Sequence, residues 1–416
     1  MINFKLVKIG EIGEVVTGKT PKTDTKDNFG QDYMFLGPSD LHESFKIKTS
    51  EKMLSAKGLE SIKSSTIDGI SICIECIGSV GNVGLVMEKC ATNQQINSIT
   101  RIKEDIYNPF YIYYWLKGKK QFLLNLANVT TIPILNKTNF SNIEINLPKK
   151  SLQDKVVNFL MLIDEKIKLN NEINKQIEAI AKLIYDYWFV QFDFPDENGK
   201  PYKSSGGKMV YDKELKREIP FGWSAGKLSD FEQKIITGKT PSTNDKNNFD
   251  GDIPFICIGD VRGNMYVTKT ELTLSESGAA SQPNKFIPKD AICVTCIASP
   301  GLVAFACSES QTNQQLNSVI CSKKENRYFL YFYLKDYFNF SKAKMGNTFP
   351  NMNKDDFSSI LLPYPKDEIV DSYSEKVKFI FDLVLQNSKE NDFLTEHRDW
   401  LLPMLMNGQV TVSEAS

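Results

Sequence analysis

The chain has 416 residues, of which 41% are hydrophobic. This length fits two domains of roughly 150 to 200 residues, each large enough to bury a core of its own. Lys and Arg total 50 while Asp and Glu total 51, which excludes a basic arm, an acidic tail and a protein that holds nucleic acid by its own net charge.

No segment predicts export or a membrane span. The first residues, Met1-Ile-Asn-Phe-Lys5, lack the apolar core of a signal peptide, and no apolar run approaches roughly 18 to 20 residues. Eight cysteines are too sparse for a disulfide scaffold. The two histidines, His42 and His397, stand in unlike settings and leave little material for a metal site or a Ser-His-Asp triad. We expect a cytoplasmic protein with no membrane contact.

The sequence nearly duplicates itself at an offset of 220 residues, which falls to 217 in the last third of each copy. A repeat of this kind predicts two structurally equivalent units. The matching segments are Thr17-Gly-Lys-Thr-Pro21 with Thr237-Gly-Lys-Thr-Pro241, Asn28-Phe29 with Asn248-Phe249, Cys73 and Cys76 with Cys293 and Cys296, Thr92-Asn-Gln-Gln-Ile-Asn97 with Thr312-Asn-Gln-Gln-Leu-Asn317, and Thr131-Ile-Pro133 with Thr348-Phe-Pro350.

Each copy begins with short β-rich runs, such as 70–77 and 291–297, separated by clusters of Gly, Pro, Asn and Ser. One helix is expected within each globule, over 110–116 in the first copy and 328–334 in the second. Asn108-Pro109 is a favourable start for the first of these helices, because Asn caps and Pro fits the first turn. Each copy therefore predicts a mixed α/β globule.

A long helix follows each globule, and its seam residues alternate in steps of four and three, as in a coiled coil. The second ladder matches the first at an offset of 217, which favours packing of the two helices on each other; packing of each helix on its own globule is the alternative. The Asn rungs would fix the register of a pair. The ladders are Val156, Leu160, Ile163, Ile167, Asn170, Asn174, Ile177, Ala181, Ile184 and Trp188, and Val377, Ile380, Val384, Asn387, Asn391, Leu394, Arg398 and Leu401.

Residues 192–226 are rich in Pro, Gly, Ser and charge and predict a long crossover connection. The resulting division of the chain is 1–150 for the first globule, 151–190 for the first long helix, 191–226 for the connector, 227–366 for the second globule and 367–410 for the second long helix.

Two motifs suggest an enzyme. Gly13-Glu-Val-Val-Thr-Gly-Lys-Thr20 matches the P-loop pattern, but no helix pattern follows it and the second copy has Gln233 in place of Gly13. Asn108-Pro-Phe-Tyr111 approaches the Asn-Pro-Pro-Tyr signature of adenine methyltransferases without its second Pro, and 78–84 has the wrong glycine spacing for a cofactor loop. A helix cap explains 108–111 better, and a turn between strands explains 78–84 better.

The two Cys-x-x-Cys motifs, beginning at Cys73 and Cys293, suggest zinc. Both lie inside apolar runs that predict buried strands, where residues three apart point to opposite faces. We therefore expect thiols in the protein core and no metal site.

Several segments carry a family resemblance. The two Thr-Gly-Lys-Thr-Pro starts, the connector motifs at 188–195, 205–208 and 218–223, and the terminal Trp400-Leu-Leu-Pro-Met-Leu-Met-Asn-Gly-Gln409 resemble the specificity subunit of type I restriction-modification systems, over essentially the whole chain. The resemblance implies an α+β fold in which two tandem, pseudo-repeated mixed α/β target-recognition domains are separated by two long antiparallel coiled-coil helices.

The resemblance also implies a function. Each domain would read one half of a bipartite site on double-stranded DNA, and the helices would set the spacer and dock two modification (methyltransferase) subunits, which restriction subunits then join. The chain itself would have no catalytic residue, cofactor or metal. A P-loop or methyltransferase enzyme, and a coiled-coil adaptor that does not bind DNA, are the alternatives.

Comparison of the two copies assigns candidate DNA-binding residues. Residues that both copies share would serve as scaffold or phosphate contacts, and residues that differ would read bases; surface variation is the alternative for the second group, and a buried structural amide for the Gln pair. The shared candidates are Lys19 and Lys239, Thr20 and Thr240, and Gln94 and Gln314. The differing candidates are Lys22 against Ser242, the turn from Ser79 to Asn82 against the turn from Ser299 to Leu302, the loop 37–48 against 259–269 with Arg262 and Asn264, and Ile134 against Asn351. Thr131 and Thr348 are further candidates.

Overall fold

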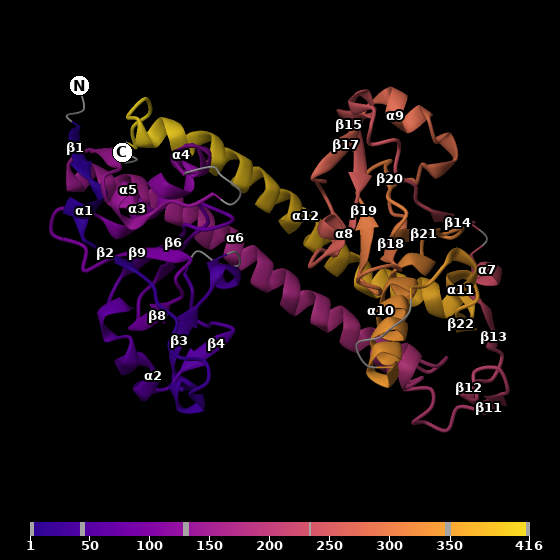
Figure 1. Cartoon of the computed structure of the whole chain (residues 1–416). Helices are drawn as coiled ribbons and strands as arrows, with labels where there is room; N and C mark the ends of the chain where they lie inside the picture. The colour runs from indigo at the N-terminus through magenta and orange to yellow at the C-terminus, as the bar shows by residue number, and fades with distance from the viewer. Residues whose placement is uncertain (1–3, 42–45, 128–132, 233, 346–350, 413–416) are drawn as a thin grey trace. The chain divides into compact units, whose positions relative to one another are not determined.

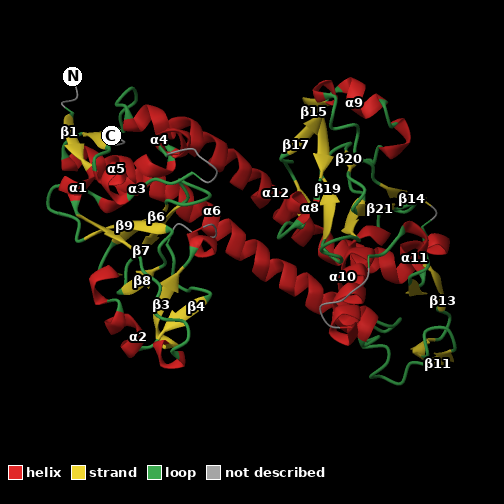
Figure 2. Ribbon diagram, viewed as in Figure 1, coloured by secondary structure: helices red, strands yellow, loops and turns green. Residues whose placement is uncertain are grey.

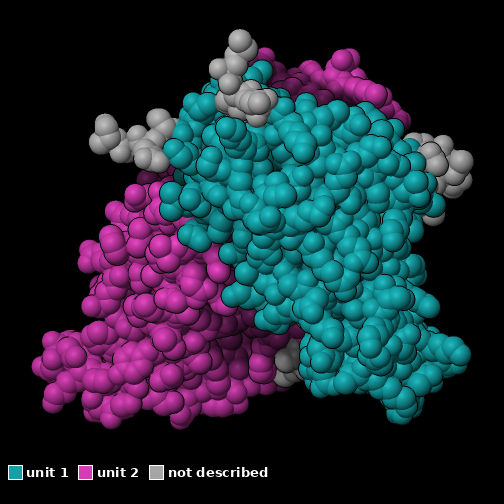
Figure 3. Space-filling model, turned by 90° about the vertical axis from the view of Figure 1, so that its left-hand side faces the viewer, with its two compact units in different colours: residues 1–165, 394–416 teal, residues 166–393 magenta. Residues whose placement is uncertain are grey.

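The computed structural model describes residues 4–41, 46–127, 133–232, 234–345 and 351–412. They form two compact units, which Figure 3 colours separately: unit 1 combines Met1–Glu165 with Leu394–Ser416, and unit 2 is Lys166–Phe393. The division cuts both long helices, α6 Lys150–Tyr185 and α12 Asp367–Met406. Each unit therefore contains one globule, the start of one long helix and the end of the other.

Unit 1 is built on an antiparallel sheet with the strand order β2-β9-β6-β7 (Figures 1 and 2). A second sheet has the order β4-β3-β8-β5, and β1 pairs with β10. The strands are β1 Lys5–Lys8, β2 Glu14–Thr17, β3 Phe29–Leu36, β4 Lys52–Leu54, β5 Thr66–Ile67, β6 Ser71–Glu75, β7 Val83–Val86, β8 Cys90–Thr92, β9 Ile96–Thr100 and β10 Glu144–Leu147. The helices are α1 Ile9–Ile12, α2 Ala56–Ser61, α3 Pro109–Lys117, α4 Lys120–Leu126 and α5 Lys137–Ser141.

Unit 2 repeats this plan with the strand orders β14-β21-β18-β19-β16 and β17-β15-β20 and the pair β13-β22. Its strands are β13 Ser224–Lys227, β14 Lys234–Thr237, β15 Phe249–Ile256, β16 Tyr266–Val267, β17 Leu272–Leu274, β18 Ile292–Thr295, β19 Val303–Ala306, β20 Gln311–Thr312, β21 Leu316–Ile320 and β22 Leu361–Tyr364. Its helices are α7 Leu228–Phe231, α8 Ile258–Val261, α9 Glu276–Ala280, α10 Asn326–Met345 and α11 Lys354–Ser358. Thr17 pairs with Asn97, and Thr237 pairs with Asn317, so strand register is repeated and the predicted duplication of a mixed α/β globule is confirmed.

The helix content differs from the prediction of one helix within each globule. Asn108 caps α3 as expected, because its side chain accepts hydrogen bonds from the backbone N–H groups of Phe110 and Tyr111. Gly118 then ends α3, and α4 and α5 follow. In the second copy Lys335 stands at the position of Gly118, and α10 continues to Met345. A residue with higher helix propensity at this position accounts for the single longer helix.

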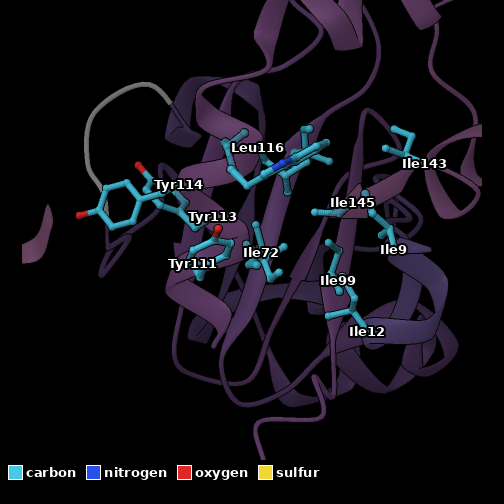
Figure 4. Packing of buried hydrophobic residues seen from close by; sticks show 14 of the residues in the cluster. Ile9, Ile12, Ile72, Ile99, Tyr111, Tyr113, Tyr114, Leu116, Ile143 and Ile145 are labelled. Atoms are coloured by element: carbon cyan, nitrogen blue, oxygen red, sulfur yellow. The ribbon is translucent and has the colours of Figure 1, made fainter. Parts of the chain in front are cut away.

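The core of unit 1 lies between α3 and the main sheet. Tyr111, Tyr114 and Leu116 of α3 are buried in one cluster with isoleucines from several elements, including Ile72 of β6 and Ile99 of β9. Figure 4 shows Tyr111 beside Ile72, while Tyr114 points away from the isoleucines. The corresponding core of unit 2 contains Tyr328, Tyr331 and Phe332 of α10. Burial of large aromatic residues at matched positions contributes to the apolar stabilisation of both units.

The long helices take part in both cores. Val156 and Leu160 near the start of α6 are buried in the core of unit 1, together with Leu402, Leu405 and Met406 at the end of α12. In unit 2, Ala181 and Tyr185 at the end of α6 are buried with Tyr373 and Val377 near the start of α12. Each helix therefore begins in the core of its own copy and ends in the core of the other copy.

Between these ends the helices pair through polar seam residues, all within unit 2. Asn170 Nδ2 donates to Asn391 Oδ1 (2.9 Å) and to Glu390 Oε2 (2.8 Å). Asn387 Nδ2 donates to Asn174 Oδ1 at 2.8 Å. As residue numbers rise along α6 they fall along α12, so the pair is antiparallel, as predicted. The alternative prediction, in which each helix packs only on its own globule, is wrong for these Asn residues, because they bond across the two helices.

The connector is more ordered than the predicted crossover. It contains a hairpin of β11 Met209–Asp212 and β12 Arg217–Pro220. Phe194 stacks on Trp223 with ring centroids 5.5 Å apart, and Phe192 contacts the same Trp edge to face. These aromatic rings belong to the core of unit 2 and hold the ends of the connector against it. Among all described helices, none combines the length and apolarity of a membrane span.

A nearly buried ion pair joins α6 and α12 within unit 1. Arg398 Nη1 lies 2.5 Å from Asp164 Oδ1, and the two side chains are only 11% and 13% exposed. Tyr114 Oη of α3 donates to the other oxygen of the same carboxylate. The polar rung Arg398 in the predicted ladder thus serves as a link among three helices.

Removal of Arg398 should destabilise unit 1. We expect Arg398→Met to cost about 3 to 5 kcal/mol, because it leaves the Asp164 carboxylate in a largely desolvated position without its cation. Hydrogen exchange at the amides of α3 and of the last turns of α12 measures this loss. The double variant Arg398→Met, Asp164→Leu should recover most of the protection; equal loss in the single and double variants would contradict the assignment.

Candidate nucleic-acid interface

Strand register brings the repeated loops of each copy to one edge of its main sheet. In unit 1, Thr17 at the end of β2 pairs with Asn97, and Glu75 at the end of β6 pairs with Ile96. The loops at 18–22, 76–82 and 93–95 therefore leave the sheet at the same edge. The register of unit 2 places 238–242, 296–302 and 313–315 in the same way. We call these two sets of residues the loop edges of units 1 and 2.

The two most similar motifs of the repeat are bonded to each other at each loop edge. In unit 1, Thr17 Oγ1 donates to Asn97 Oδ1 at 2.6 Å, and the Lys19 amide donates to Thr92 O at 2.9 Å. In unit 2 the same bonds join Thr237 to Asn317 and the Lys239 amide to Thr312. The Thr-Gly-Lys-Thr-Pro and Thr-Asn-Gln-Gln motifs thus form one structural element in each copy.

Glycine is required at the centre of this element. A Cβ atom on Gly18 would lie 2.2 Å from Asn93 O and 2.3 Å from Thr92 O, and Gly238 has equivalent neighbours at 2.1 and 2.3 Å. Both neighbours are backbone atoms, which cannot rotate away as a side chain could. Close approach of two loop backbones therefore explains why both copies keep this glycine.

The shared Gln candidates are exposed, so the alternative of a buried structural amide is wrong. Thr20 Oγ1 donates to Gln94 Oε1 at 2.7 Å, and Thr240 Oγ1 donates to Gln314 Oε1 at 2.5 Å. Because the Thr hydroxyl uses the amide oxygen, the bond orients the amide NH₂ group as a donor at the surface.

The lysine candidates lie beside this pair. The side chains of Lys19, Lys22 and Lys239 are exposed, as is that of Ser242. Asn28 Nδ2 donates to the carbonyl of Lys22 at 2.9 Å, and in unit 2 Asn248 bonds Ser242 O in the same way. The repeated Asn-Phe pairs therefore hold the backbone of a position whose side chain differs between the copies.

The turn at 76–82 has a polar network in unit 1. Glu75 is buried, and its carboxylate accepts hydrogen bonds from the Ser79 amide (3.3 Å) and from Asn82 Nδ2 (2.7 Å). Asn82 Oδ1 in turn accepts a bond from Lys120 Nζ at 2.8 Å. Ser79 lies in the exposed turn as predicted, but the side chain of Asn82 is engaged at both ends by protein groups.

Three candidates, Arg262, Ser299 and Asn351, lie at the matching turn of unit 2. Arg262 Nη2 donates to Ser299 Oγ at 3.3 Å, and the amide of Ala298 donates to Asn351 Oδ1 at 3.3 Å. Asn264, two residues after Arg262, is also exposed. Its side chain donates a hydrogen bond to Asp260 O at 3.0 Å and so stabilises the end of α8. Thr131 and Thr348, the remaining candidates, lie outside the described residues.

Sequence comparison missed Lys120 and Glu75. Lys120 is the first residue of α4, distant in sequence from the turn, and its charge contacts the loop edge only because α4 packs against Gly81. Glu75 aligns with Thr295 and lies inside the apolar run 72–77. Its carboxylate in that run could have indicated a polar network, since a buried charge requires partners.

The motifs that suggest an enzyme have structural roles. β2 occupies the middle of the P-loop pattern, and the next helical turn, Lys26–Asn28, is a short 3₁₀ turn. Cys73 and Cys76 belong to different core clusters, as do Cys293 and Cys296, so each pair points to opposite faces as predicted. Burial raises the pKa of Cys73 and Cys76 to about 12, which keeps them as thiols. Within the described residues no cluster of His, Cys, Asp and Glu could hold a metal ion.

Comparisons with known proteins agree on one family. The family model described as "Type I restriction modification DNA specificity domain" matches residues 1–179 and 220–392. The chain is 34% identical over 359 residues to the type I restriction enzyme HindI specificity subunit of Haemophilus influenzae, covering 70% of this chain and 76% of that protein. It is 25% identical to the MjaIX specificity subunit of Methanocaldococcus jannaschii, covering 99% and 94%.

A solved structure shares the fold. The crystal structure of a type I restriction-modification S subunit from M. genitalium superposes with a TM-score of 0.54 at 16% identity, covering 100% of this chain and 97% of that chain. This likeness confirms the predicted fold class.

Addition of a methyl group at Gly18 should disrupt the loop edge of unit 1. We expect Gly18→Ala to cost on the order of 1 to 3 kcal/mol by forcing two backbones apart, and to speed hydrogen exchange at the Lys19 amide. Gly37→Ala is a matched control, because a Cβ at Gly37 would have its nearest neighbours at 3.8 Å. Equal exchange rates in the two variants would count against the tight contact.

Proposed function

Because the chain belongs to the family of type I restriction-modification DNA specificity domains, we propose that it is the non-catalytic subunit that selects the DNA sequence for a modification and restriction complex. Its loop edges bind double-stranded DNA, and each reads one half of a bipartite site. Methylation and cleavage are then performed by the modification and restriction subunits.

One observation carries this proposal: the two loop edges have the same frame but different exposed side chains. Thr17, Gly18 and Asn97 recur with the same contacts in unit 2. On that frame the exposed Lys22 is replaced by the exposed Ser242, and the half-buried Asn82 by the half-buried Leu302. A constant frame with variable side chains suits two modules that bind the same DNA backbone and read different bases.

Roles for the candidate residues follow from this division. Lys19 and Lys239, which both copies share, bind phosphate, and the oriented amides of Gln94 and Gln314 supply hydrogen-bond donors near them. Lys22 in unit 1 and Ser242 in unit 2 differ between the copies and give each edge its own chemistry, whereas Ser79 and Ser299 are a matched pair in turns that otherwise differ. The net charge of −1 means that partners supply much of the total phosphate contact.

The helix seam sets the spacer between the half-sites. Slippage of α6 along α12 would separate Asn170 from Asn391 and Asn387 from Asn174. Since Asn170 and Asn387 are buried, a slipped pairing would leave their amides without partners, at a cost of roughly 1 to 3 kcal/mol each. The Asn rungs therefore select one register among the possible ones.

A different row of helix residues docks the modification subunits. Leu162, Leu169, Gln176 and Leu183 of α6 are spaced by seven, and the residues 217 further along, Phe379, Gln386, Phe393 and Trp400, form the same row on α12. The six apolar members are between 56% and 72% exposed. A heptad row of exposed large apolar side chains fits an amphipathic helix of a partner. Two repeat-related rows fit two copies of that partner, one on each helix.

Mapping of methylated adenines by long-read sequencing, with and without this gene, tests the function. We expect loss of the gene to remove one bipartite motif. Replacement of 259–269 by the equivalent loop of another family member should then change one half of that motif and leave the other half and the spacer as they were. An unchanged map in a strain with active modification subunits, or a change in both halves, would contradict the proposal.

Charge on the α6 row should remove one modification subunit. We expect Leu169→Glu, Leu183→Glu to reduce the stoichiometry of the co-purified complex, measured by native mass spectrometry, from two modification subunits to one. Phe393→Glu, Trp400→Glu should remove the other. Lys175→Glu, exposed on a different face of α6, is the control; unchanged stoichiometry in the row variants, or the same loss in the control, would exclude this docking surface.

A further inference from the structure

The turn at each loop edge carries a cation, and in the two units the cation comes from different elements. The turns 76–82 and 296–302 join equivalent strands, β6 to β7 and β18 to β19. They have equal length and keep a positive backbone φ at Gly81 and Gly301. They are therefore the same structural feature, and their environments can be compared position by position.

In unit 1 the cation is Lys120, held by a chain of hydrogen bonds. Lys120 Nζ donates to Asn82 Oδ1 at 2.8 Å, and Asn82 Nδ2 donates to Glu75 Oε2 at 2.7 Å. Glu75 is 3% exposed, so the chain runs from the interior of the unit to an exposed ammonium group. The Asn82 amide has its oxygen and its nitrogen committed to these bonds, which leaves it poorly suited to read a base.

In unit 2 each part of that chain is replaced. Thr295 stands in place of Glu75 and Leu302 in place of Asn82. Phe338, which is buried, packs against Gly301 where Lys120 packs against Gly81. The helix that supplies the cation in unit 1 thus supplies an apolar core residue in unit 2.

Arg262 takes over the charge in unit 2. Arg262 lies in the loop between α8 and β16, whereas Lys120 lies on a helix. Arg262 Nη2 donates a hydrogen bond to Ser299 Oγ of the turn at 3.3 Å. Lys120 and Arg262 do not occupy equivalent sequence positions, and each is bonded to a neutral side chain of the same turn. Both side chains are exposed, so burial does not explain why the turn has a cation in each unit.

Both turns have a cation, although a different element supplies it in each unit. This indicates that the cation binds something that both half-sites have in common. The bases differ between half-sites, whereas the phosphate backbone is the same. Lys binds phosphate as a point charge, and hydrogen bonding of its ammonium to Asn82 leaves further N–H donors for a phosphate oxygen.

We propose that Lys120 contacts a DNA phosphate at the half-site bound by unit 1, that Arg262 makes the equivalent contact in unit 2, and that Asn82 is a positioning residue for Lys120. This rests on the proposed function. It changes the roles suggested by sequence comparison, because Lys120 was not a candidate there and Asn82 and Arg262 were candidates for base reading.

Salt dependence of DNA binding tests the proposal. The probe is a duplex carrying the mapped bipartite motif, and the protein is the complete complex with its modification subunits. We expect Lys120→Gln and Arg262→Gln each to reduce the slope of log affinity against log salt by about 0.9, and the double variant by about twice that, since each phosphate contact contributes about 0.9 to the slope. The methylated motif should stay the same in all three variants.

Phosphate ethylation interference assigns each contact to a half-site. Lys120→Gln should abolish interference at one position in one half-site, and Arg262→Gln at the corresponding position in the other. Asn82→Ala should weaken the Lys120 signal and add nothing in a Lys120→Gln background, a pattern that a loss of stability alone would not produce. Lys103→Gln is the control, because it also removes one exposed positive charge from unit 1. Lys103 lies beyond the end of β9 that is opposite to the loop edge, so this variant should leave the salt slope and the interference pattern unchanged.

The outcomes separate this inference from the function on which it rests. A wild-type complex that does not bind the duplex overturns both. If the wild-type complex binds and Lys120→Gln keeps the full slope, only the inference fails. A changed base in the methylated motif of Lys120→Gln would show that Lys120 reads a base, which also overturns the phosphate assignment.

Discussion

The loop edges depend on one close contact between two stretches of backbone. Gly18 lies so near the carbonyls of Thr92 and Asn93 that no side chain fits between them, and Gly238 makes the same contact with Thr312 and Asn313. The hydrogen bond between Thr17 and Asn97, repeated in unit 2, fixes the same two segments from the strand side. Because the frame is rigid, substitutions on its outer surface can change chemistry without changing the positions of the loops.

Variation on this frame follows a physical pattern. Where one unit buries a carboxylate under its turn, the other uses a threonine hydroxyl; where one brings a lysine from α4, the other packs a phenylalanine from α10 and brings an arginine from a loop. Each set satisfies its own buried polar groups, so the turn keeps its shape. Coupled changes of this kind allow two copies of one sequence to diverge in the surface they present while they retain one fold.

The middle of the paired long helices departs from the usual distribution of polar and apolar residues. Their shared seam contains asparagines that bond across it, while Leu162, Leu183, Phe379 and Trp400 are largely exposed. For an isolated chain this arrangement lowers solubility and forgoes apolar stabilisation in the seam. In the proposed function both features have a use, because the polar seam selects one helix register and the exposed apolar rows dock the modification subunits.

Much of this could be predicted from the sequence, because it depends on neighbours along the chain. The offset of the repeat predicted two equivalent units. The Asn108-Pro109 pair predicted the start of α3, and the matching ladders favoured two helices that pack on each other through Asn rungs, whose antiparallel direction the family resemblance implied. The alternation of strand residues predicted that Cys73 and Cys76 point apart. Periodicity and capping act within a few residues, and the sequence displays them directly.

Only the tertiary structure decided which distant residues act together. The bond between Thr20 and Gln94 spans 74 positions, and the charge of Lys120 reaches the turn because Gly81 lets α4 approach. The connector was predicted as a crossover from its polar composition, yet Phe192, Phe194 and Trp223 fold its ends onto unit 2. These contacts depend on how sheets, helices and loops pack across long separations in the chain. The spacing of residues in the sequence contains no record of such packing, so the loop edges and their cations emerge only in the folded protein.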